Sequence, residues 1–310
     1  MTTDRIRIGT RGSQLALWQA NHVKAQLEAA HPGLEAELVT ITTTGDRVQD
    51  RSLLEVGGKG AFVKEIEEAL LGGEIDLAVH SMKDVPVQLP EGLELPVVCR
   101  REDPRDAFLS NAHEHPRHMP AGARIGSSSL RRKCQLMARF PELEVAEIRG
   151  NVDTRLRKLD EGQYDAVVLA AAGLRRLGWA DRITNLLDPA DSLPAMGQGT
   201  IGLECRADDE ATKERLRAVE DAETAVRTRA EWALNRRMQG GCEVPMGGYA
   251  ELDGDRLRLR GLVGEPDGSR LIEDAVEGPA DEAEALGVEL AERLLAAGAE
   301  AILEKVRRHG

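Results

Sequence analysis

The sequence predicts an α/β protein built from two similar open-sheet domains, followed by a smaller α+β domain. Three observations support this class. Strand and helix patterns alternate over the first 99 residues, short segments of that region recur in the next hundred, and turn-separated strands occupy the C-terminal part. Alternating strands and helices are typical of sheets whose strands run parallel. The length of 310 residues is enough for two or three domains.

The first 99 residues carry a strand–helix–strand–helix–strand pattern. The first strand covers 5–8, and the helix after it can be capped by Ser13 and runs to about residue 30. The pattern continues with a strand over 37–43, a helix over 61–71 and a buried strand over 75–79. Ligands of such sheets bind at the carboxyl ends of the strands. Those ends hold Thr10-Arg11-Gly12-Ser13 and His80-Ser81-Met82-Lys83-Asp84. A glycine turn before a capped helix is typical of an anion site. Lys59, in the glycine loop 56–60, adds a further cation, although a solvated turn explains it equally well.

Two short segments recur in the second hundred residues. Residues 7–10 match 124–127, and residues 73–79 match 162–168, each at the same place in the strand–helix order. A helix over 129–140 follows the first of these matches. The repetition favours two similarly built domains. We expect residues 90–120, rich in Pro, Arg, Asp and His, to form a crossover between them.

Arginines gather at the predicted strand ends of the second domain. They are Arg131 and Arg132 at a helix start, Arg149 and Arg155 around a glycine turn, and Arg175 and Arg176 after the third strand. A single arginine is best explained as a surface ion pair. Six of them in a chain of net charge −13 indicate a ligand with several carboxylates or phosphates. The acidic balance disfavours nucleic acid as a partner.

The last third predicts a hinge and a compact α+β domain. A Pro/Gly-rich linker over 193–200 precedes a strand over 201–205; a helix over 222–238 ends at a glycine pair before Cys242. Turns at 253–255 and 266–268 separate three strands, and helices over 280–297 and 300–308 close the chain. Cys242 is therefore expected on a tight loop, where it is either an ordinary free thiol or a reactive one.

Composition excludes several other classes. The four cysteines form no C-x-x-C pair, so neither a disulfide framework nor a zinc site is expected. His113, His115 and His118 lie in a polar, proline-containing loop, where we predict no metal site. There is no apolar signal region and no run long enough for a membrane span. We expect a cytoplasmic protein, and a monomer, although no residue pattern fixes the oligomeric state.

A series of motifs runs through nearly the whole chain. They are Ile8-Gly-Thr-Arg-Gly-Ser13, Val56-Gly-Gly-Lys-Gly60, His80-Ser-Met-Lys-Asp-Val-Pro86, Ser128-Ser-Leu-Arg-Arg132, Arg149-Gly-Asn-Val152, Leu193-Pro-Ala195 with Gly197-Gln-Gly199, and Gly240-Gly-Cys242. In order and spacing they resemble the porphobilinogen deaminase family. The resemblance implies two periplasmic-binding-protein-like α/β domains and a smaller C-terminal α+β domain with a three-stranded sheet. The first would span 1–99 and 200–217, the second 100–199 and the third 218–310, with hinges near 96–104 and 194–200.

The same resemblance implies an activity and assigns residues. A transferase would join four porphobilinogen molecules head to tail into hydroxymethylbilane, on a dipyrromethane cofactor bound through Cys242. Cofactor-binding residues would be Ser81, Lys83, Asp84, Ser127, Ser129, Arg131, Arg132 and Arg155. Substrate-binding residues would be Arg11, Ser13, Lys59, Arg149, Gly150, Arg176 and Gln198. Asp84 would stabilise the cationic azafulvene left by loss of ammonia or, when protonated, assist departure of the amine.

Two points stand against a simple transfer of roles. Glu55 occupies a position where many relatives carry lysine, so that position has no assured role in holding substrate. Duplicate α/β lobes joined by a hinge also describe a two-lobed anion-binding protein without catalysis. That alternative accounts for the arginines but leaves Cys242 and the third domain without a function.

Overall fold

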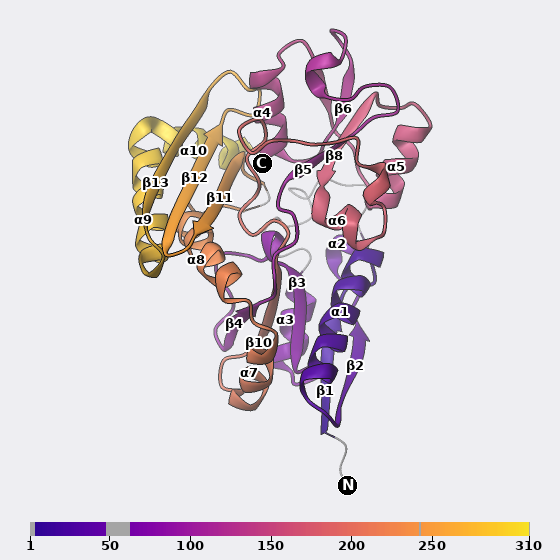
Figure 1. Ribbon diagram of the computed structural model, residues 1–310, viewed down its shortest axis with the longest axis vertical. Coiled ribbons are helices and arrows are strands. Elements are labelled where there is room, and N and C mark those ends of the chain that lie inside the picture. Colours follow the sequence, from indigo (N-terminus) through magenta and orange to yellow (C-terminus); the bar gives the residue numbers. More distant parts are fainter. Residues whose placement is uncertain (1–3, 48–62, 242, 310) are drawn as a thin grey trace. The chain divides into compact units, whose positions relative to one another are not determined.

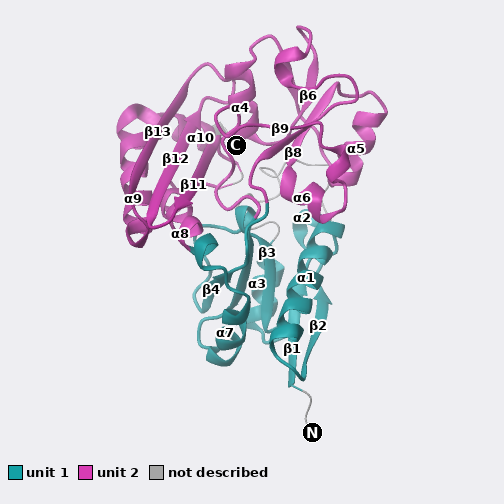
Figure 2. Cartoon of the chain, in the orientation of Figure 1, with its two compact units in different colours: residues 1–102, 200–225 teal, residues 103–199, 226–310 magenta. Residues whose placement is uncertain are grey.

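The computed structural model describes residues 4–47, 63–241 and 243–309. The chain divides into two compact units, one of residues 1–102 and 200–225, the other of residues 103–199 and 226–310 (Figure 2). Within the part of the chain that the structure describes, every helix is too short or too polar to span a bilayer.

The first unit is a five-stranded mixed sheet with helices (Figure 1). Its strands are β1 (Asp4–Thr10), β2 (Leu34–Thr40), β3 (Leu77–Ser81), β4 (Leu93–Val98) and β10 (Ile201–Arg206), in the order β2-β1-β3-β10-β4. β1 runs parallel to β2 and β3, and β10 runs antiparallel to β3 and β4. The helices are α1 (Gln14–Ala30), α2 (Thr44–Arg47), α3 (Lys64–Leu71) and α7 (Glu210–Leu216). Separate apolar clusters pack around Leu27 of α1 and around Leu70 of α3.

The second unit contains a five-stranded sheet of the same design. Its strands are β5 (Asp106–Leu109), β6 (Arg124–Gly126), β7 (Glu144–Ala146), β8 (Ala166–Ala170) and β9 (Asn185–Leu186), in the order β7-β6-β8-β5-β9. The helices α4 (Leu130–Arg139), α5 (Val152–Asp160) and α6 (Ala171–Arg176) belong to it. β5 is antiparallel to β8, as β10 is to β3, so the two sheets share their strand directions at equivalent positions.

The C-terminal residues form an antiparallel sheet of three strands, β11 (Met246–Asp253), β12 (Arg256–Gly264) and β13 (Leu271–Pro279). α8 (Ala222–Arg237), α9 (Ala283–Leu294) and α10 (Glu300–His309) accompany it, and α9 packs on β12 and β13. A π-helical turn, Leu295–Ala299, joins α9 to α10, with Gly298 at a φ of 101°. Single turns of 3-10 helix lie at Met82–Asp84, Pro116–His118, Ala180–Arg182, Arg217–Val219 and Ala280–Glu282.

The repeated segments occupy equivalent places, which confirms the predicted duplication. In the first unit, the backbone N–H of Arg7 donates to Asp76 (2.8 Å), and the N–H of Asp76 donates back to the carbonyl of Arg7 (2.9 Å). In the second, Arg124 and Asp165 make the same two hydrogen bonds, at 2.7 and 2.9 Å. The sequence matches therefore correspond to the same reciprocal pair of hydrogen bonds in both sheets, which we call the clasp.

The main correction concerns residues 90–120, where we expected a crossover. They contain two strands, β4 and β5. β4 includes Pro96, and β5 is a four-residue strand whose residues are all buried, so neither shows the alternation that marks a half-exposed strand. The strand expected at 37–43 is Leu34–Thr40, and the helix expected from about residue 61 begins at Lys64.

Candidate active site

A small cavity lies at the carboxyl ends of β1 and β3 in the first unit. Its volume is about 80 Å³. Polar side chains of Arg11, Ser13, Gln19, His80, Ser81 and Asp84 line it, together with the apolar residues Leu15, Ala16, Val63 and Val79. The structure thus brings together four of the residues selected from the sequence, at the sheet edge where α/β folds bind ligands.

The β1 side of the cavity supplies a cation and a helix start. The Ser13 hydroxyl accepts a hydrogen bond from the N–H of Ala16 (3.3 Å) and so caps α1. The Arg11 guanidinium donates through Nε to both carboxylate oxygens of Asp46 (3.1 and 3.2 Å). Burial opposes ionisation of Asp46, but hydrogen bonds from Arg11 and Thr43 hold its pKa below the usual range. Arg11 is therefore oriented by a carboxylate of its own unit.

The β3 side supplies Ser81 and Asp84. The expected loop is a single 3-10 turn, Met82–Asp84, and it is anchored at both ends. The N–H of Met82 donates to the carbonyl of Thr200 (2.9 Å), and the N–H of Val85 donates to the carbonyl of Met82 (3.2 Å). Lys83, in the middle of this turn, is half-buried and does not line the cavity. These bonds fix the backbone on which Asp84 is presented.

Sequence reasoning missed two residues of this cavity, Gln19 and His80, as site residues. The Gln19 amide, on the buried face of α1, donates to the Ser81 hydroxyl (2.9 Å). His80 Nε2 lies 2.7 Å from Oε2 of Glu204, and both side chains are buried. A glutamine facing inward on an amphipathic helix is the one signal that could have identified Gln19. Glu204 is brought next to His80 by the antiparallel pairing of β10 with β3.

The second unit holds a buried cluster of arginines around a carboxylate that the sequence did not single out. Arg131 and Arg132 occupy the first turn of α4, which Ser129 caps by accepting from the N–H of Arg132 (3.4 Å). Both guanidinium groups donate to Asp106, the first residue of β5. Burial opposes ionisation of Asp106, but the charges of the two arginines hold its pKa far below its ordinary value. Ser127, also buried, accepts from the N–H of Ser129 (3.3 Å).

Gln198 belongs to the same cluster. Its amide donates to the carbonyl of Pro104 (2.6 Å) and to Asp106 (2.9 Å), and its oxygen accepts from Arg131 (3.5 Å). The structure therefore unites Arg131, Arg132 and Gln198, which the sequence had assigned to different ligands.

Arg155 lies beside this cluster and has a different environment. Its Nε donates to the carbonyl of Gly150 (2.8 Å), and its terminal nitrogens have no hydrogen-bond partner among the described residues. Burial, with a smaller contribution from the charge of Arg132, lowers the pKa of Arg155 to about 10. The group remains a cation at neutral pH and offers a complete guanidinium fork to an anion. Gly150, at a φ of 108°, makes the turn that places it.

Arg149 and Arg176 are engaged elsewhere in the second unit. Arg149 donates to Glu147 (2.9 Å), and Arg176 donates to the carbonyl of Gly199 (2.7 Å). Three residues for which the sequence suggested a role, Glu55, Lys59 and Cys242, lie outside the described residues. Cys242 follows α8 by five positions, after the glycine pair that the sequence singled out.

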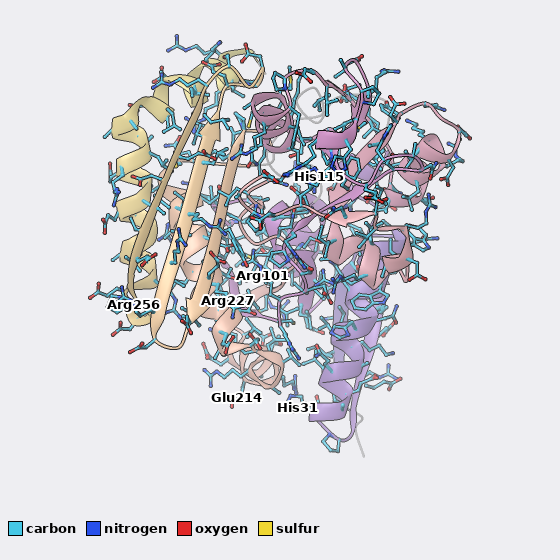
Figure 3. The ribbon with its side chains drawn as sticks, turned by 45° about the horizontal axis from the view of Figure 1, so that its top comes forward. His31, Arg101, His115, Glu214, Arg227 and Arg256 are labelled. Carbon is cyan, nitrogen blue, oxygen red and sulfur yellow. The ribbon has the colours of Figure 1, made fainter. Side chains whose placement is uncertain are left out.

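The histidine-rich loop carries no group of ligands. Among the described residues, no three or more His, Cys, Asp or Glu side chains come together as a metal site. Figure 3 labels His115. Its ring packs edge-on to Phe140, with centroids 6.0 Å apart, and accepts hydrogen bonds from Arg117. Burial, with the charge of Arg117, lowers the pKa of His115.

Each unit therefore offers a distinct chemistry. The first presents a fixed carboxylate, Asp84, with a cation and hydroxyl groups around one cavity. The second presents two guanidinium groups paired with one carboxylate and, beside them, Arg155, whose terminal nitrogens make no hydrogen bond to the described residues. A polycarboxylate and a developing positive charge are what such groups stabilise.

Comparison with known proteins identifies two matches that span most of the chain. The family model described as porphobilinogen deaminase, dipyromethane cofactor binding domain, matches residues 6–214. The model described as porphobilinogen deaminase, C-terminal domain, matches residues 225–296.

Similar solved structures include three proteins with two-lobed folds. The methionine-binding protein MetQ is 16% identical, with 71% of this chain and 92% of that chain covered and a TM-score of 0.44. A periplasmic substrate-binding protein of an ABC transporter from Coxiella burnetii is 14% identical, with 71% and 94% covered and a TM-score of 0.44. The periplasmic VFT2 domain of Bordetella pertussis BvgS is 18% identical, with 74% and 90% covered and a TM-score of 0.41. Likeness at this level carries no argument about function.

Proposed function

The chain belongs to the porphobilinogen deaminase family, and from that premise we propose that it joins four porphobilinogen molecules head to tail and releases hydroxymethylbilane. The coarser assignment, a transferase of tetrapyrrole synthesis with a dipyrromethane-binding domain, follows from the family itself. At each step the amino group of the aminomethyl substituent leaves as ammonia, the remaining methylene carbon forms a carbon–carbon bond to a ring carbon of the neighbouring pyrrole, and that ring carbon loses its proton. Water then adds to the terminal methylene carbon when hydroxymethylbilane is released.

The observation that carries the proposal is Asp84 on its anchored turn at the wall of the cavity. Departure of ammonia from porphobilinogen leaves a cationic azafulvene. A carboxylate held in place beside that charge stabilises it without reorganisation. Arg11 and Ser13 line the same cavity and would bind the acetate and propionate groups of the incoming substrate. We also propose, from the family resemblance, that Lys59, Arg149, Gly150, Arg176 and Gln198 bind substrate, although none of the last four is among the described residues that line this cavity.

The arginine cluster fits a cofactor that bears carboxylates. Two guanidinium groups pair with one carboxylate there and Arg155 lies nearby, so the site carries an excess of positive charge. Arg155 would hold a cofactor carboxylate through its terminal nitrogens, and Arg131, Arg132, Ser81, Lys83, Ser127 and Ser129 would complete the binding. When bound, the dipyrromethane supplies the pyrrole carbon onto which the first substrate is added.

Cys242 is proposed as the point of attachment. Sulfur is a good nucleophile for a methylene carbon, provided that its pKa permits ionisation. Burial raises the pKa of Cys134 and of Cys205 to about 12, which makes both poor nucleophiles. We also propose that residues 218–310 act as a separate cofactor-bearing domain. Their own sheet and apolar core support this, even though residues 226–310 form one compact unit with residues 103–199 and residues 218–225 belong to the first unit.

Intact mass of the purified protein, with its colour in an acidic aldehyde dye, tests the function. We expect an adduct of two pyrrole units on the wild type and on Cys205→Ala, and none on Cys242→Ser. A full adduct on Cys242→Ser would move the attachment to another cysteine. Absence of both adduct and turnover in the wild type would favour a non-catalytic anion-binding protein.

A further inference from the structure

Asp106 is a fully buried carboxylate that joins three segments of the second unit. Its exposed fraction is 0%. It begins β5, and it accepts hydrogen bonds from the first turn of α4 and from residues 192–198. Ser192 donates to Oδ2 at 2.7 Å, and Gln198 donates to Oδ1 at 2.9 Å.

The two arginines in the first turn of α4, Arg131 and Arg132, both use Asp106 as their carboxylate partner. Arg131 donates through Nη1 to Oδ2 (2.7 Å) and through Nη2 to Oδ1 (3.2 Å). Arg132 donates to Oδ1 through Nε (2.9 Å) and Nη2 (2.8 Å). One carboxylate thus fixes the planes of two neighbouring guanidinium groups, which would otherwise repel each other in a buried site.

The hydrogen-bond capacity of these groups shows how Asp106 acts. The carboxylate accepts six hydrogen bonds, four on Oδ1 and two on Oδ2, so it has none left for a ligand or a proton. Arg131 is nearly saturated, because its terminal nitrogens also donate to the carbonyl of Leu193 and to Gln198. Arg132 donates through Nε and one N–H of each terminal nitrogen, to Asp106 and to the carbonyl of Val168. Its other two N–H groups have no partner among the described residues.

The charges of Asp106 and the neighbouring arginines show how much of the cluster is available to a ligand. Two guanidinium groups against one carboxylate leave an excess of one positive charge, to which Arg155 adds its own. Loss of Asp106 would leave two buried cations, Arg131 and Arg132, without the counter-ion that now pairs with both. The carboxylate therefore decides both where the cations point and how much of their charge a ligand can use.

We propose that Asp106 is the positioning residue of the cofactor site: it orients Arg131 and Arg132 and sets the excess charge that the carboxylates of the dipyrromethane neutralise. The inference rests on the proposed function of this site. Asp106 touches neither cofactor nor substrate, and it acts through the arginines and Gln198.

Asp106→Asn tests the proposal, with Asp103→Asn as matched control. Asp103 also binds two arginines of the same unit, but they are Arg105 (2.9 and 2.7 Å) and Arg175 (3.0 Å) in place of Arg131 and Arg132. Cofactor content by intact mass and kcat are measured on protein whose fold is checked by circular dichroism. For Asp106→Asn we expect a loss of activity on the order of 10- to 100-fold, as for other residues that orient a binding group, and a matching fall in cofactor content. Asp103→Asn should keep its cofactor.

A double variant covers the case in which Asp106→Asn does not fold. Asp106→Asn with Arg131→Gln removes one charge of each sign, so it should restore folding but not cofactor content. Full cofactor content and normal kcat in either folded variant would overturn the proposal. Equal loss in Asp103→Asn would also overturn it, because any arginine-paired carboxylate would then matter as much. A wild type without adduct would refute the proposed function instead.

Discussion

Neutralising Glu67 should stabilise the first unit, and only above acidic pH. Glu67 lies on α3 with 8% of its surface exposed. Burial, together with the negative charge of Glu204, raises its pKa from 4.5 to about 7, and the nearby His80 opposes this only in part. Glu68 of the same helix adds to the repulsion, whereas Arg7, Asp76 and Arg206 form a separate ion-pair group. On β4, Glu94 is paired with Lys213.

The sign and size follow from linkage. The folded protein keeps a proton on Glu67 between pH 4.5 and about 7 that the unfolded chain has released, so stability falls as pH rises through this window. The two pKa values differ by about 2.5 pH units; at about 1.4 kcal/mol per unit the loss of stability is about 3.5 kcal/mol, complete above pH 7. Glu67→Gln removes the titration, so it should gain up to about 3.5 kcal/mol at pH 8 and nothing at pH 4.

Urea unfolding at pH 4 to 8 measures the effect, with hydrogen exchange of β3 peptides to locate it in the first unit. Glu68→Gln, on the same helix but exposed at its side chain and near Lys64 (3.9 Å), is the control and should change stability little at any pH. Equal stability gains for Glu67→Gln at pH 4 and pH 8 would refute the reasoning, because the gain would then not come from the proton.

Three further predictions concern the proposed chemistry and the backbone around it. Asp84→Asn should fold and bind substrate but lose on the order of 100- to 1000-fold in kcat, measured by steady-state kinetics; a near-normal kcat would place the essential carboxylate elsewhere. Glu55→Lys should lower the KM for porphobilinogen, more so at low salt. An unchanged KM at every ionic strength would contradict a role of position 55 near the substrate. Gly150→Ala should lower the free energy of unfolding by about 1–3 kcal/mol, because φ is 108° and a Cβ would lie 2.6 Å from Thr154. Gly122→Ala, at a φ of 80° and with no atom within 4 Å of its Cβ, should lower the free energy of unfolding by less. Thermal melts of both variants measure the difference.

The sequence was most informative where patterns are local. Helix capping, glycine stops and the side-chain patterns of helices and strands each depend on a few neighbouring residues. The structure confirms the helices that Ser13 and Ser129 cap, helix α8 and the three C-terminal strands. The repeat was recognisable because the Arg7–Asp76 clasp and its counterpart keep the same short sequence on each strand.

What the sequence could not provide depends on tertiary contact. Asp106 stands in a polar stretch that predicts a loop, and only the placement of β5 between β8 and β9 buries it beside α4. Glu67 and Glu204 have no local sign of burial, since a glutamate on a helix or strand is normally exposed. Two arginines at a helix start indicated an anion, but the anion they contact in the structure belongs to the protein.

The position of β10 has a consequence for synthesis of the chain. This strand lies between β3 and β4, yet it is made of residues 201–206, which follow the entire second α/β sheet. On the ribosome, the first sheet therefore waits with the edges of β3 and β4 unpaired until about two thirds of the polypeptide has been translated. The second sheet has all its strands by residue 186 and can fold first. The first sheet is thus completed after the second, although it begins earlier in the sequence, and its unpaired strand edges are the part of the nascent chain that a chaperone would protect.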